Sequence, residues 1–187
     1  MTNKNFFTFN EYQPSKDDVI LLDTNIMIDL FFPVYGNQKN NVSSLYSKIV
    51  ASKAKLLITS VQISELINRY IRIQFGLYVN EHPECIDFKK QYRSTSDFQE
   101  NMNIALDVIK NEIMPIFSPI DDGFSQIESS KIYLYNFGYD FNDALILQIA
   151  EKNSAIFITN DGDFLGYDIK CKLVSDNSLL KSMNKKR

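Results

Sequence analysis

Four acidic residues lie where one expected secondary-structure element meets the next. Asp23 and Asp161 each follow a short apolar run, and Glu65 and Asp143 stand near the beginnings of two expected helices. In an open parallel sheet, residues just past the carboxyl ends of the strands converge on one crevice, so acids distant in sequence become neighbours. Clustered carboxylates repel one another unless a cation neutralises them, and hard divalent cations prefer oxygen ligands. The pattern therefore predicts a divalent-metal site.

Asp23 and Glu65 each have a simpler structural explanation. The string Asp23-Thr24-Asn25 can cap a helix, in which case the Asp23 carboxylate would only accept backbone N–H bonds. Thr24 or Asn25 can do this equally well, which favours a functional role for Asp23. Glu65 lies opposite the apolar stripe of its helix and, taken alone, is typical of a solvated surface acid. Only its position close to a strand end makes it a candidate ligand.

Asp143 and Asp161 each have a second acid nearby. Asp140 and Asp143 are three residues apart at the start of a helix, where an arrangement close to a capping box would explain both. We assign capping mainly to Asp140 and metal binding to Asp143. Asp161 and Asp163 can belong to a plain turn, and the residues after them lack the remaining ligands of an EF-hand. We expect Asp161 to be a ligand and Asp163 to be a helix cap or an outer partner of the ligands.

Short apolar runs alternate with segments of helical periodicity, and few glycines or prolines interrupt them. Strands are expected at 19–22, 56–58, 155–158 and 167–174. Helices are expected at 26–32, 42–51, 61–73, 98–113, 127–137 (ended by Gly138) and 140–152. Strands that alternate with helices form βαβ units, which imply a parallel sheet with helices on both faces. The predicted fold class is α/β, a parallel-sheet αβα sandwich with an enlarged helical middle portion.

The length and composition suit one soluble domain. We expect a single domain over residues 1–187, with a helical insertion at about 73–137 and a basic, frayed tail at about 181–187. No apolar stretch approaches the roughly 20 residues of a membrane span and no signal peptide is evident, so a cytoplasmic protein without membrane contact is expected. The two cysteines, Cys85 and Cys171, are expected to be free thiols.

Other chemistries find little support in the sequence. His82 is the only histidine, so neither a zinc site nor a nucleophile that depends on a histidine base is expected. No glycine-rich phosphate loop is present. The formal net charge of −3 means that any nucleic-acid binding must use local basic patches and bound metal.

The segments 22–25, 60–66, 142–146 and 158–164, in this order, resemble the acidic motifs of the PIN-domain nucleases. The resemblance covers about residues 19–174, and the stretch 73–137 is longer than a minimal PIN domain requires. It implies a metal-dependent endoribonuclease that hydrolyses phosphodiester bonds in RNA. It further implies that Mg²⁺ or Mn²⁺ is held by four catalytic acids, which are Asp23, Glu65, Asp143 and Asp161.

The resemblance also suggests roles for the residues around the acids and a set of partners. The groups expected to orient the ligands or contact phosphate are Thr24, Asn160, Asp163 and Asp140. Basic residues that could track the RNA backbone, or else form a solvated face, are Arg69, Arg72, Lys89, Lys90 and Arg93. Tyr92 could stack on unpaired bases. Many small PIN proteins are toxins inhibited by an antitoxin, so an antitoxin partner is a further expectation, as is a homo-oligomer.

Two other functions stay open at this point. A non-catalytic PIN-like module could bind RNA or a protein without cutting, although such a module has little reason to collect mutually repelling carboxylates. A phosphate-ester hydrolase of another α/β family could use Asp23 as a covalent nucleophile. That chemistry calls for a second Asp two positions later, where this chain has Asn25.

Overall fold

A computed structural model of the chain describes residues 5–33, 40–133 and 140–183. Its strands form one parallel sheet in the order β1-β6-β5-β2-β3-β4. The strands are β1 (Phe6–Phe7), β2 (Val19–Leu22), β3 (Lys55–Ile58), β4 (Phe117–Pro119), β5 (Ile156–Ile158) and β6 (Leu173–Val174). The predicted parallel α/β fold is confirmed.

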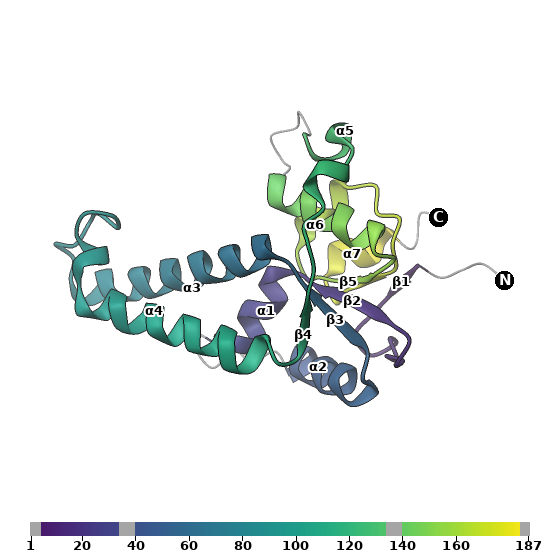
Figure 1. Ribbon diagram of the computed structural model, residues 1–187, viewed down its shortest axis with the longest axis horizontal. Helices are drawn as coiled ribbons and strands as arrows, with labels where there is room; N and C mark the ends of the chain where they lie inside the picture. The colour runs from purple at the N-terminus through teal and green to yellow at the C-terminus, as the bar shows by residue number, and fades with distance from the viewer. Residues whose placement is uncertain (1–4, 34–39, 134–139, 184–187) are drawn as a thin grey trace.

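Helices cover both faces of this sheet, as Figure 1 shows. On one face lie α1 (Thr24–Phe31) and α2 (Asn40–Ser52). On the other lie α5 (Ser129–Ile132), α6 (Phe141–Lys152) and α7 (Ser178–Met183). The sheet is therefore the middle layer of a three-layer sandwich.

The apolar runs of the sequence serve two cores at once. In β2, Ile20 and Leu22 pack in the core on the α1–α2 side, whereas Leu21 packs in the core on the α6 side. Successive side chains of a strand point to opposite faces, and a parallel sheet covered on both faces must be apolar on both. This is why β2 is a continuous apolar run rather than an alternating one.

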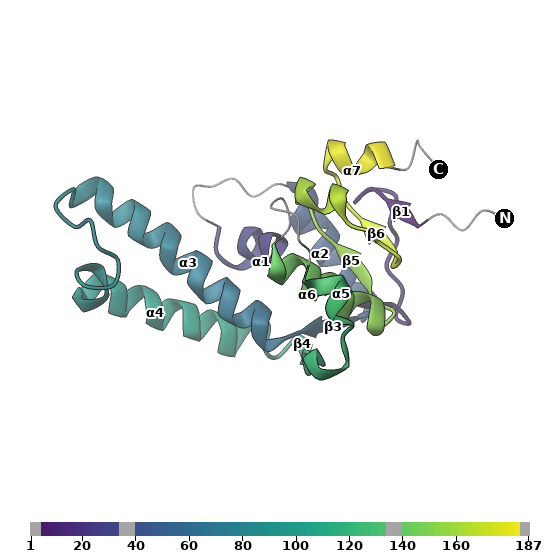
Figure 2. The ribbon, with the colours of Figure 1, turned by 90° about the horizontal axis from the view of Figure 1, so that it is seen from above.

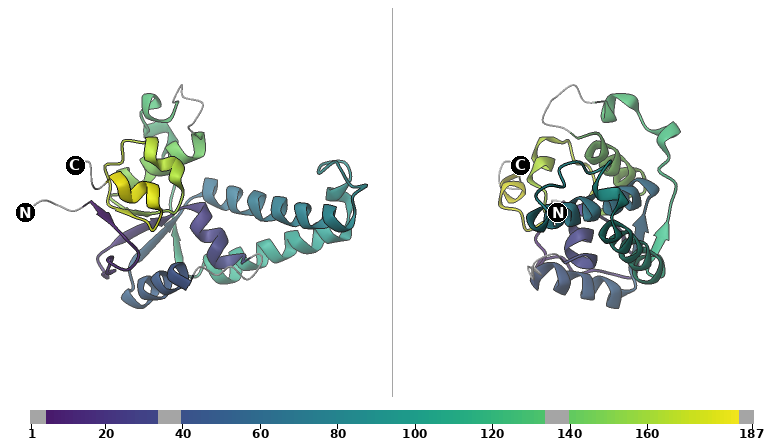
Figure 3. Two further views of the ribbon diagram at one scale, coloured as in Figure 1. Left: turned by 180° about the vertical axis from the view of Figure 1, so that it is seen from behind. Right: turned by 90° about the vertical axis from the view of Figure 1, so that its left-hand side faces the viewer.

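The enlarged middle portion is a helical arm that projects from the sheet (Figures 1 and 2). Its first helix, α3 (Ser60–Glu81), is 22 residues long and packs beside α4 (Ser96–Val108), which continues as a π-helix over Ile109–Ile113. The views from behind and from the end confirm that the two helices lie side by side (Figure 3). At the tip of the arm, a short 3-10 helix over Tyr92–Ser94 precedes α4.

Aromatic rings form a small core at the outer end of the arm. Phe75 of α3 contacts Phe88 and Tyr92 of the connecting loop at centroid distances of 5.3 and 5.2 Å. The Tyr92 hydroxyl donates to Asp97 Oδ1 at 2.7 Å, and its ring is fully buried. The prediction that Tyr92 stacks on bases is therefore wrong, because this ring is already used to close the arm.

Several predicted elements differ from the structure. The helix predicted at 127–137 is reduced to α5, because Tyr133 already leaves helical geometry; positions 134–137 and Gly138 lie outside the described residues. The strand predicted at 167–174 pairs only at Leu173–Val174. Pro119, predicted to lie beyond a helix end, is in β4, an edge strand where a residue without an N–H is tolerated.

The remaining expectations are met in part. Helix α7 includes the start of the predicted frayed tail and ends at Met183, and the rest of the tail lies outside the described residues. Cys85 and Cys171 are free. The single-domain boundaries stay a prediction. Within the described residues, no helix is both long and apolar enough to cross a membrane.

Gln62 joins the end of β2 to the start of α3. Its amide donates to the Leu22 carbonyl at 2.6 Å, and its oxygen accepts from the Thr59 backbone N–H at 3.1 Å. The Thr59 hydroxyl oxygen accepts the Gln62 backbone N–H at 3.2 Å, which completes a capping box in the buried interior. This arrangement sets where α3 begins relative to β2.

Replacing Gln62 with Leu should leave the Leu22 carbonyl and the Thr59 N–H buried without these partners. An unsatisfied buried polar group costs about 1–3 kcal/mol, so we expect a loss of about 3 kcal/mol in the free energy of unfolding. Urea denaturation measures this loss. The control is Gln99→Leu, at an exposed position of α4; equal stability of the two variants would contradict the assignment.

Candidate functional site

The four predicted acids come from four elements that meet at the carboxyl edge of the sheet. Asp23 directly follows β2, and Asp161 follows β5, the neighbouring strand. Glu65 lies in the second turn of α3, which leaves β3, and Asp143 lies in the first turn of α6. Because the strands are parallel, their carboxyl ends share one edge, and the chain returns to this edge at each acid.

Asp23 is the most buried of the four acids, with 3% of its surface exposed. The Thr159 hydroxyl donates to Asp23 Oδ2 at 2.6 Å and accepts the Asp161 backbone N–H at 2.9 Å. Asp23 occupies the N-cap position of α1, yet its side chain makes no capping hydrogen bond. The backbone N–H of Asn25 still lowers the pKa of Asp23, but the shorter contact of its carboxylate is with Thr159.

Asn25 links the two acids that follow strands. Its amide Nδ2 donates to Asp161 Oδ2 at 2.7 Å and lies 3.5 Å from Asp23 Oδ2. One amide group thus neutralises part of the repulsion between the two carboxylates and fixes how they face each other.

Glu65 is held separately, on the α3 side of the site. Thr24, the residue after Asp23, donates its hydroxyl to Glu65 Oε2 at 3.0 Å. Arg69, one turn further along α3, lies 3.5 Å from Glu65 Oε1. The Glu65 side chain is only 22% exposed, so it is not the freely solvated acid that helical periodicity alone suggested.

The pKa values of Asp23 and Asp143 are raised, in part by the charges of the other acids. Burial is the main cause that raises the pKa of Asp23 to about 6, and the charges of Asp161 and Glu65 raise it further, against a lowering by the Thr159 hydrogen bond. Burial also leads the causes that raise the pKa of Asp143 to about 7, followed by the charges of Asp23, Asp140, Asp161 and Glu65. Charge repulsion of this kind requires proximity. The four acids therefore form one electrostatic cluster.

The cluster does not form a closed ligand cage. Within residues 5–33, 40–133 and 140–183, no three acidic, histidine or cysteine side chains are arranged so that they could together hold a metal ion. The donors that converge are all oxygen atoms, the type that hard divalent cations prefer. Their chemistry therefore fits such a cation.

The supporting residues differ in part from those predicted. Asp140 accepts the Asn142 N–H at 2.7 Å and caps α6, as expected. Asp161, rather than Asp163, caps the 3-10 helix that follows, because Asp161 Oδ1 accepts the Asp163 N–H at 3.0 Å. The predicted capping role of Asp163 is therefore wrong. Asn160 directs its side-chain oxygen to the Asp176 N–H at 3.0 Å, away from the acids.

Sequence reasoning missed the two side chains that hold Asp23 in place. Asn25 was considered only as a helix cap, and Thr159 was not singled out. A signal for Asn25 existed, since a polar amide two residues after a strand-end acid is well placed to bridge to a neighbouring strand end. Thr159 had a weaker signal, a hydroxyl immediately after the apolar run of β5.

Of the basic residues predicted to contact RNA, only Arg69 lies beside the acidic cluster. Arg72 is one turn beyond Arg69 on α3, and the remaining three lie in the loop at the tip of the arm or in the 3-10 helix after it. All of them are exposed, and they are Arg69, Arg72, Lys89, Lys90 and Arg93. Contact of these residues with the RNA backbone stays a prediction.

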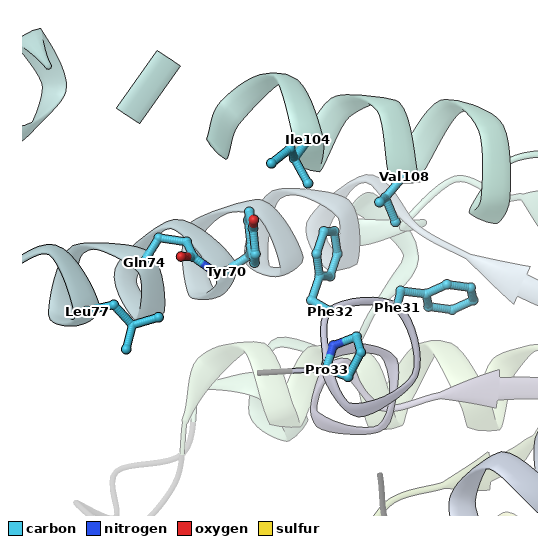
Figure 4. A pocket seen from close by; sticks show the side chains of 8 residues that line it. All are labelled: Phe31, Phe32, Pro33, Tyr70, Gln74, Leu77, Ile104 and Val108. Carbon is cyan, nitrogen blue, oxygen red and sulfur yellow. The ribbon is translucent and has the colours of Figure 1, made fainter. Parts of the chain in front are cut away.

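A separate apolar groove of about 410 Å³ lies where the end of α1 meets α3 and α4. Figure 4 shows its lining, with Phe32 and Tyr70 near the centre and Ile104 of α4 above them. No acidic side chain lines it. It has apolar surface but no group for acid–base or metal chemistry, so the acidic cluster is the stronger candidate for a functional site.

The raised pKa values predict a pH-dependent stability. Between pH 4 and 7, folded Asp143 keeps a proton that the unfolded chain releases, so the contribution of Asp143 to stability falls as pH rises through this range. Without divalent cations, Asp143→Asn should be more stable than the wild-type protein at pH 8, and this gain should vanish near pH 4. Urea denaturation in EDTA at the two pH values measures this. A gain that is the same at both pH values would contradict the electrostatic account.

The chain was compared with known proteins and with models of protein families. No curated protein matches the chain. It is similar to one chain of the FitAB complex bound to an IR36 DNA fragment, at 19% identity and a TM-score of 0.47, covering 83% of this chain and 94% of that one. A chain of VapBC2 from Rickettsia felis bound to a fragment of promoter DNA is similar at 20% identity and a TM-score of 0.42, covering 85% and 98%. The PIN domain family model matches residues 20–170, a span that includes all four acids, and the protein therefore belongs to the PIN domain family.

Proposed function

We propose that this protein is a metal-dependent endoribonuclease that cuts single-stranded RNA at the acidic cluster. Members of its family are generally nucleases. The observation that supports the proposal is that Asp23 and Asp161 are linked through Asn25 and Thr159 at the edge of the sheet where Thr24 also holds Glu65. Asp143 is the fourth acid, and the charges of Asp23, Asp161 and Glu65 contribute to raising its pKa. A site built from mutually repelling carboxylates is destabilised unless a cation occupies it, which is a reason to connect the cluster with catalysis.

The cation we propose is Mg²⁺ or Mn²⁺, held by Asp23, Glu65, Asp143 and Asp161. Such an ion would activate a water molecule as the nucleophile and offset the charge that builds on the leaving oxygen. Mg²⁺ usually keeps several of its waters and needs only one or two direct carboxylate bonds. No three of the described acids are placed to share an ion directly, so we propose that some of the four would contact the ion through its bound waters.

The surrounding residues would orient the acids. Thr159 holds Asp23 through Oδ2, and Asn25 holds Asp161 through Oδ2, so the two carboxylates at the strand ends are fixed by neutral partners. Thr24 and Arg69 fix Glu65, and the exposed Arg69 side chain could also contact a phosphate group. Preset orientation matters because a ligand displaced by about 1 Å can lower the rate about a hundredfold.

One observation favours a second function, a non-catalytic PIN-like module that binds RNA or a protein. No three of the described acids are arranged to hold an ion together, and a cluster without a catalytic role would have the same property. The third possibility, Asp23 as a covalent nucleophile, is less compatible with the structure. Asp23 is 3% exposed and accepts a short bond from Thr159, which leaves it poorly placed to attack a phosphate.

An inhibitory protein partner, of antitoxin type, is part of the proposal. Such a partner would act by covering the acidic edge of the sheet. Co-expression with the product of the adjacent gene tests this, since a true antitoxin should remove the ribonuclease activity and co-purify with the chain. The structure describes a single chain, so self-association stays a prediction.

The activity prediction concerns Asp23 and Asp143. The wild-type protein should cut single-stranded RNA slowly in Mg²⁺ or Mn²⁺, and EDTA should stop it. Asp23→Asn and Asp143→Asn should each lower the cleavage rate by at least about a hundredfold, because each removes a negative ligand from the ion. Gel analysis of a labelled RNA measures the rate.

The matched control is Asp168→Asn, at an exposed position away from the cluster, which should cut at the wild-type rate. Circular dichroism should show folded protein for all three variants. Undiminished cleavage by folded Asp23→Asn would contradict the role of Asp23 as a metal ligand in catalysis. Absence of cleavage by the wild-type protein under all metal conditions would favour the module that only binds.

The metal prediction is independent of catalysis. Saturating Mn²⁺ at pH 8 should raise the Tm of the wild-type protein by about 3 °C, because an ion that binds only the folded state stabilises it. Asp143→Asn should show a clearly smaller rise. Differential scanning fluorimetry in EDTA and in Mn²⁺ gives the comparison; equal rises in the two proteins would place the ion elsewhere.

A further inference from the structure

One exposed face of α3 runs from the acidic cluster to the tip of the arm. Successive helical residues are rotated by about 100°, which places Arg69, Arg72, Gly76 and Asn80 within about 60° of the direction of Glu65. All four are exposed. We call this face the α3 strip. Glu81, the other acid on this helix, is rotated by about 160° from Glu65 and lies on the opposite side.

Gly76 is the unexpected residue of the strip. A glycine inside a helix costs about 0.5–1 kcal/mol relative to alanine, and nothing in the packing here requires it. A Cβ atom at position 76 would have no atom within 4 Å. The glycine therefore leaves bare backbone on an open surface, where another chain could approach closely.

The loop at the tip is held rigid by two side chains. Gln91 Oε1 accepts the backbone N–H groups of Ile86 and Asp87, both at 2.8 Å. Asp87 Oδ1 in turn accepts the N–H groups of Lys89 and Lys90, again at 2.8 Å. This internal bonding leaves both lysine side chains exposed and partly offsets the charge of Asp87. The two lysine side chains thus extend from a fixed backbone, beside the acids Glu84 and Asp87 of the same loop.

Two arginines flank the ring that joins the strip to the tip. The Arg72 guanidinium lies 4.2 Å from the centroid of the Phe88 ring, and that of Arg93 lies 5.3 Å from it. Cation–π contacts hold a guanidinium in place without neutralising it, as a carboxylate would. Both groups keep their charge available for an external anion.

We propose that the α3 strip and the tip form an arm that binds the RNA on one side of the bond that is cut. This proposal rests on the proposed function. The arm continues directly from Glu65, and its exposed side bears arginines and lysines that complement a phosphate backbone. From Glu65 to Glu81 the helix rises about 24 Å. At about 3.4 Å per stacked nucleotide this spans roughly seven nucleotides. The preferred substrates are RNAs that extend at least this far to one side of the cut.

The test compares a short and a long RNA, oligouridylates of 6 and 24 nucleotides. The variant Lys89→Glu/Lys90→Glu keeps the backbone bonds of the tip but reverses its charge. We expect its kcat/KM for the 24-mer to fall about tenfold and that for the 6-mer to stay within about twofold of wild type. The control, Lys48→Glu/Lys55→Glu, makes the same change in net charge at exposed positions away from the arm and should leave both values unchanged.

Binding measured without catalysis gives a second readout. Fluorescence anisotropy of the labelled 24-mer in EDTA, at several salt concentrations, should give a log–log salt slope about 1.4 smaller for Lys89→Glu/Lys90→Glu than for wild type, from two lost phosphate contacts. Gly76→Glu should weaken 24-mer binding, whereas Gly76→Ala, which adds only a methyl group to the open surface, should bind nearly as well as wild type.

The results separate the arm from the proposed function. Loss of 24-mer binding in the arm variants would support the arm even if the wild-type protein cut no RNA, an outcome that would remove only the nuclease. Equal losses for the 6-mer and the 24-mer, or an unchanged salt slope, would overturn the arm. Unchanged RNA binding by Lys89→Glu/Lys90→Glu would also overturn it and leave the tip as a surface for a protein partner.

Discussion

Electrostatic repulsion among carboxylates at one edge of a parallel sheet is the constraint on which this account depends. Strands that all run in one direction bring the residues that follow them to the same edge, and here those residues include acids. Burial strengthens the repulsion, since Asp23 is almost completely removed from water. The fold therefore carries an unfavourable interaction at this edge, and such local conflicts are expected at functional sites.

The structure around the acids limits this repulsion without removing it. Thr159 and Asn25 give Asp23 and Asp161 fixed neutral partners, and Arg69 partly balances Glu65. Burial, together with the charges of Asp23, Asp140, Asp161 and Glu65, raises the pKa of Asp143 to about 7. Gln62 links this edge to the core, because it joins the end of β2 to the cap of α3 within the buried interior.

The sheet centre could be predicted from sequence because its signals are local. Continuous apolar runs mark β2, β3 and β5, and the acids and caps after them mark the functional edge. The short edge strands had no such signal, since β1 has two residues and β4 ends in Pro119. Helix α3 was predicted to end near residue 73 and extends to Glu81. Its continuation depends on packing between Phe75 and the distant rings of the loop, a contact that periodicity cannot show.

The contacts between side chains at the site were the least predictable part. Residue types and spacing indicated which acids converge, but the partners of Asp23 depend on which strands are neighbours, and Thr159 reaches it across the β2–β5 pair. For Phe141, the first residue of α6, the sequence pattern does not show how exposed the side chain is. It shares a helical face with the buried Ala144 and Leu145, yet it is 42% exposed.

Anomalous diffraction from crystals soaked in Mn²⁺ tests the central claim most directly, because it locates the ion without reference to activity. The account predicts a peak at the carboxyl edge of the sheet, about 2.0–2.5 Å from an oxygen of Asp23 and of at least one other acid of the cluster. A fully occupied Mn²⁺ site elsewhere, with this edge empty and the four carboxylates unmoved, would contradict it.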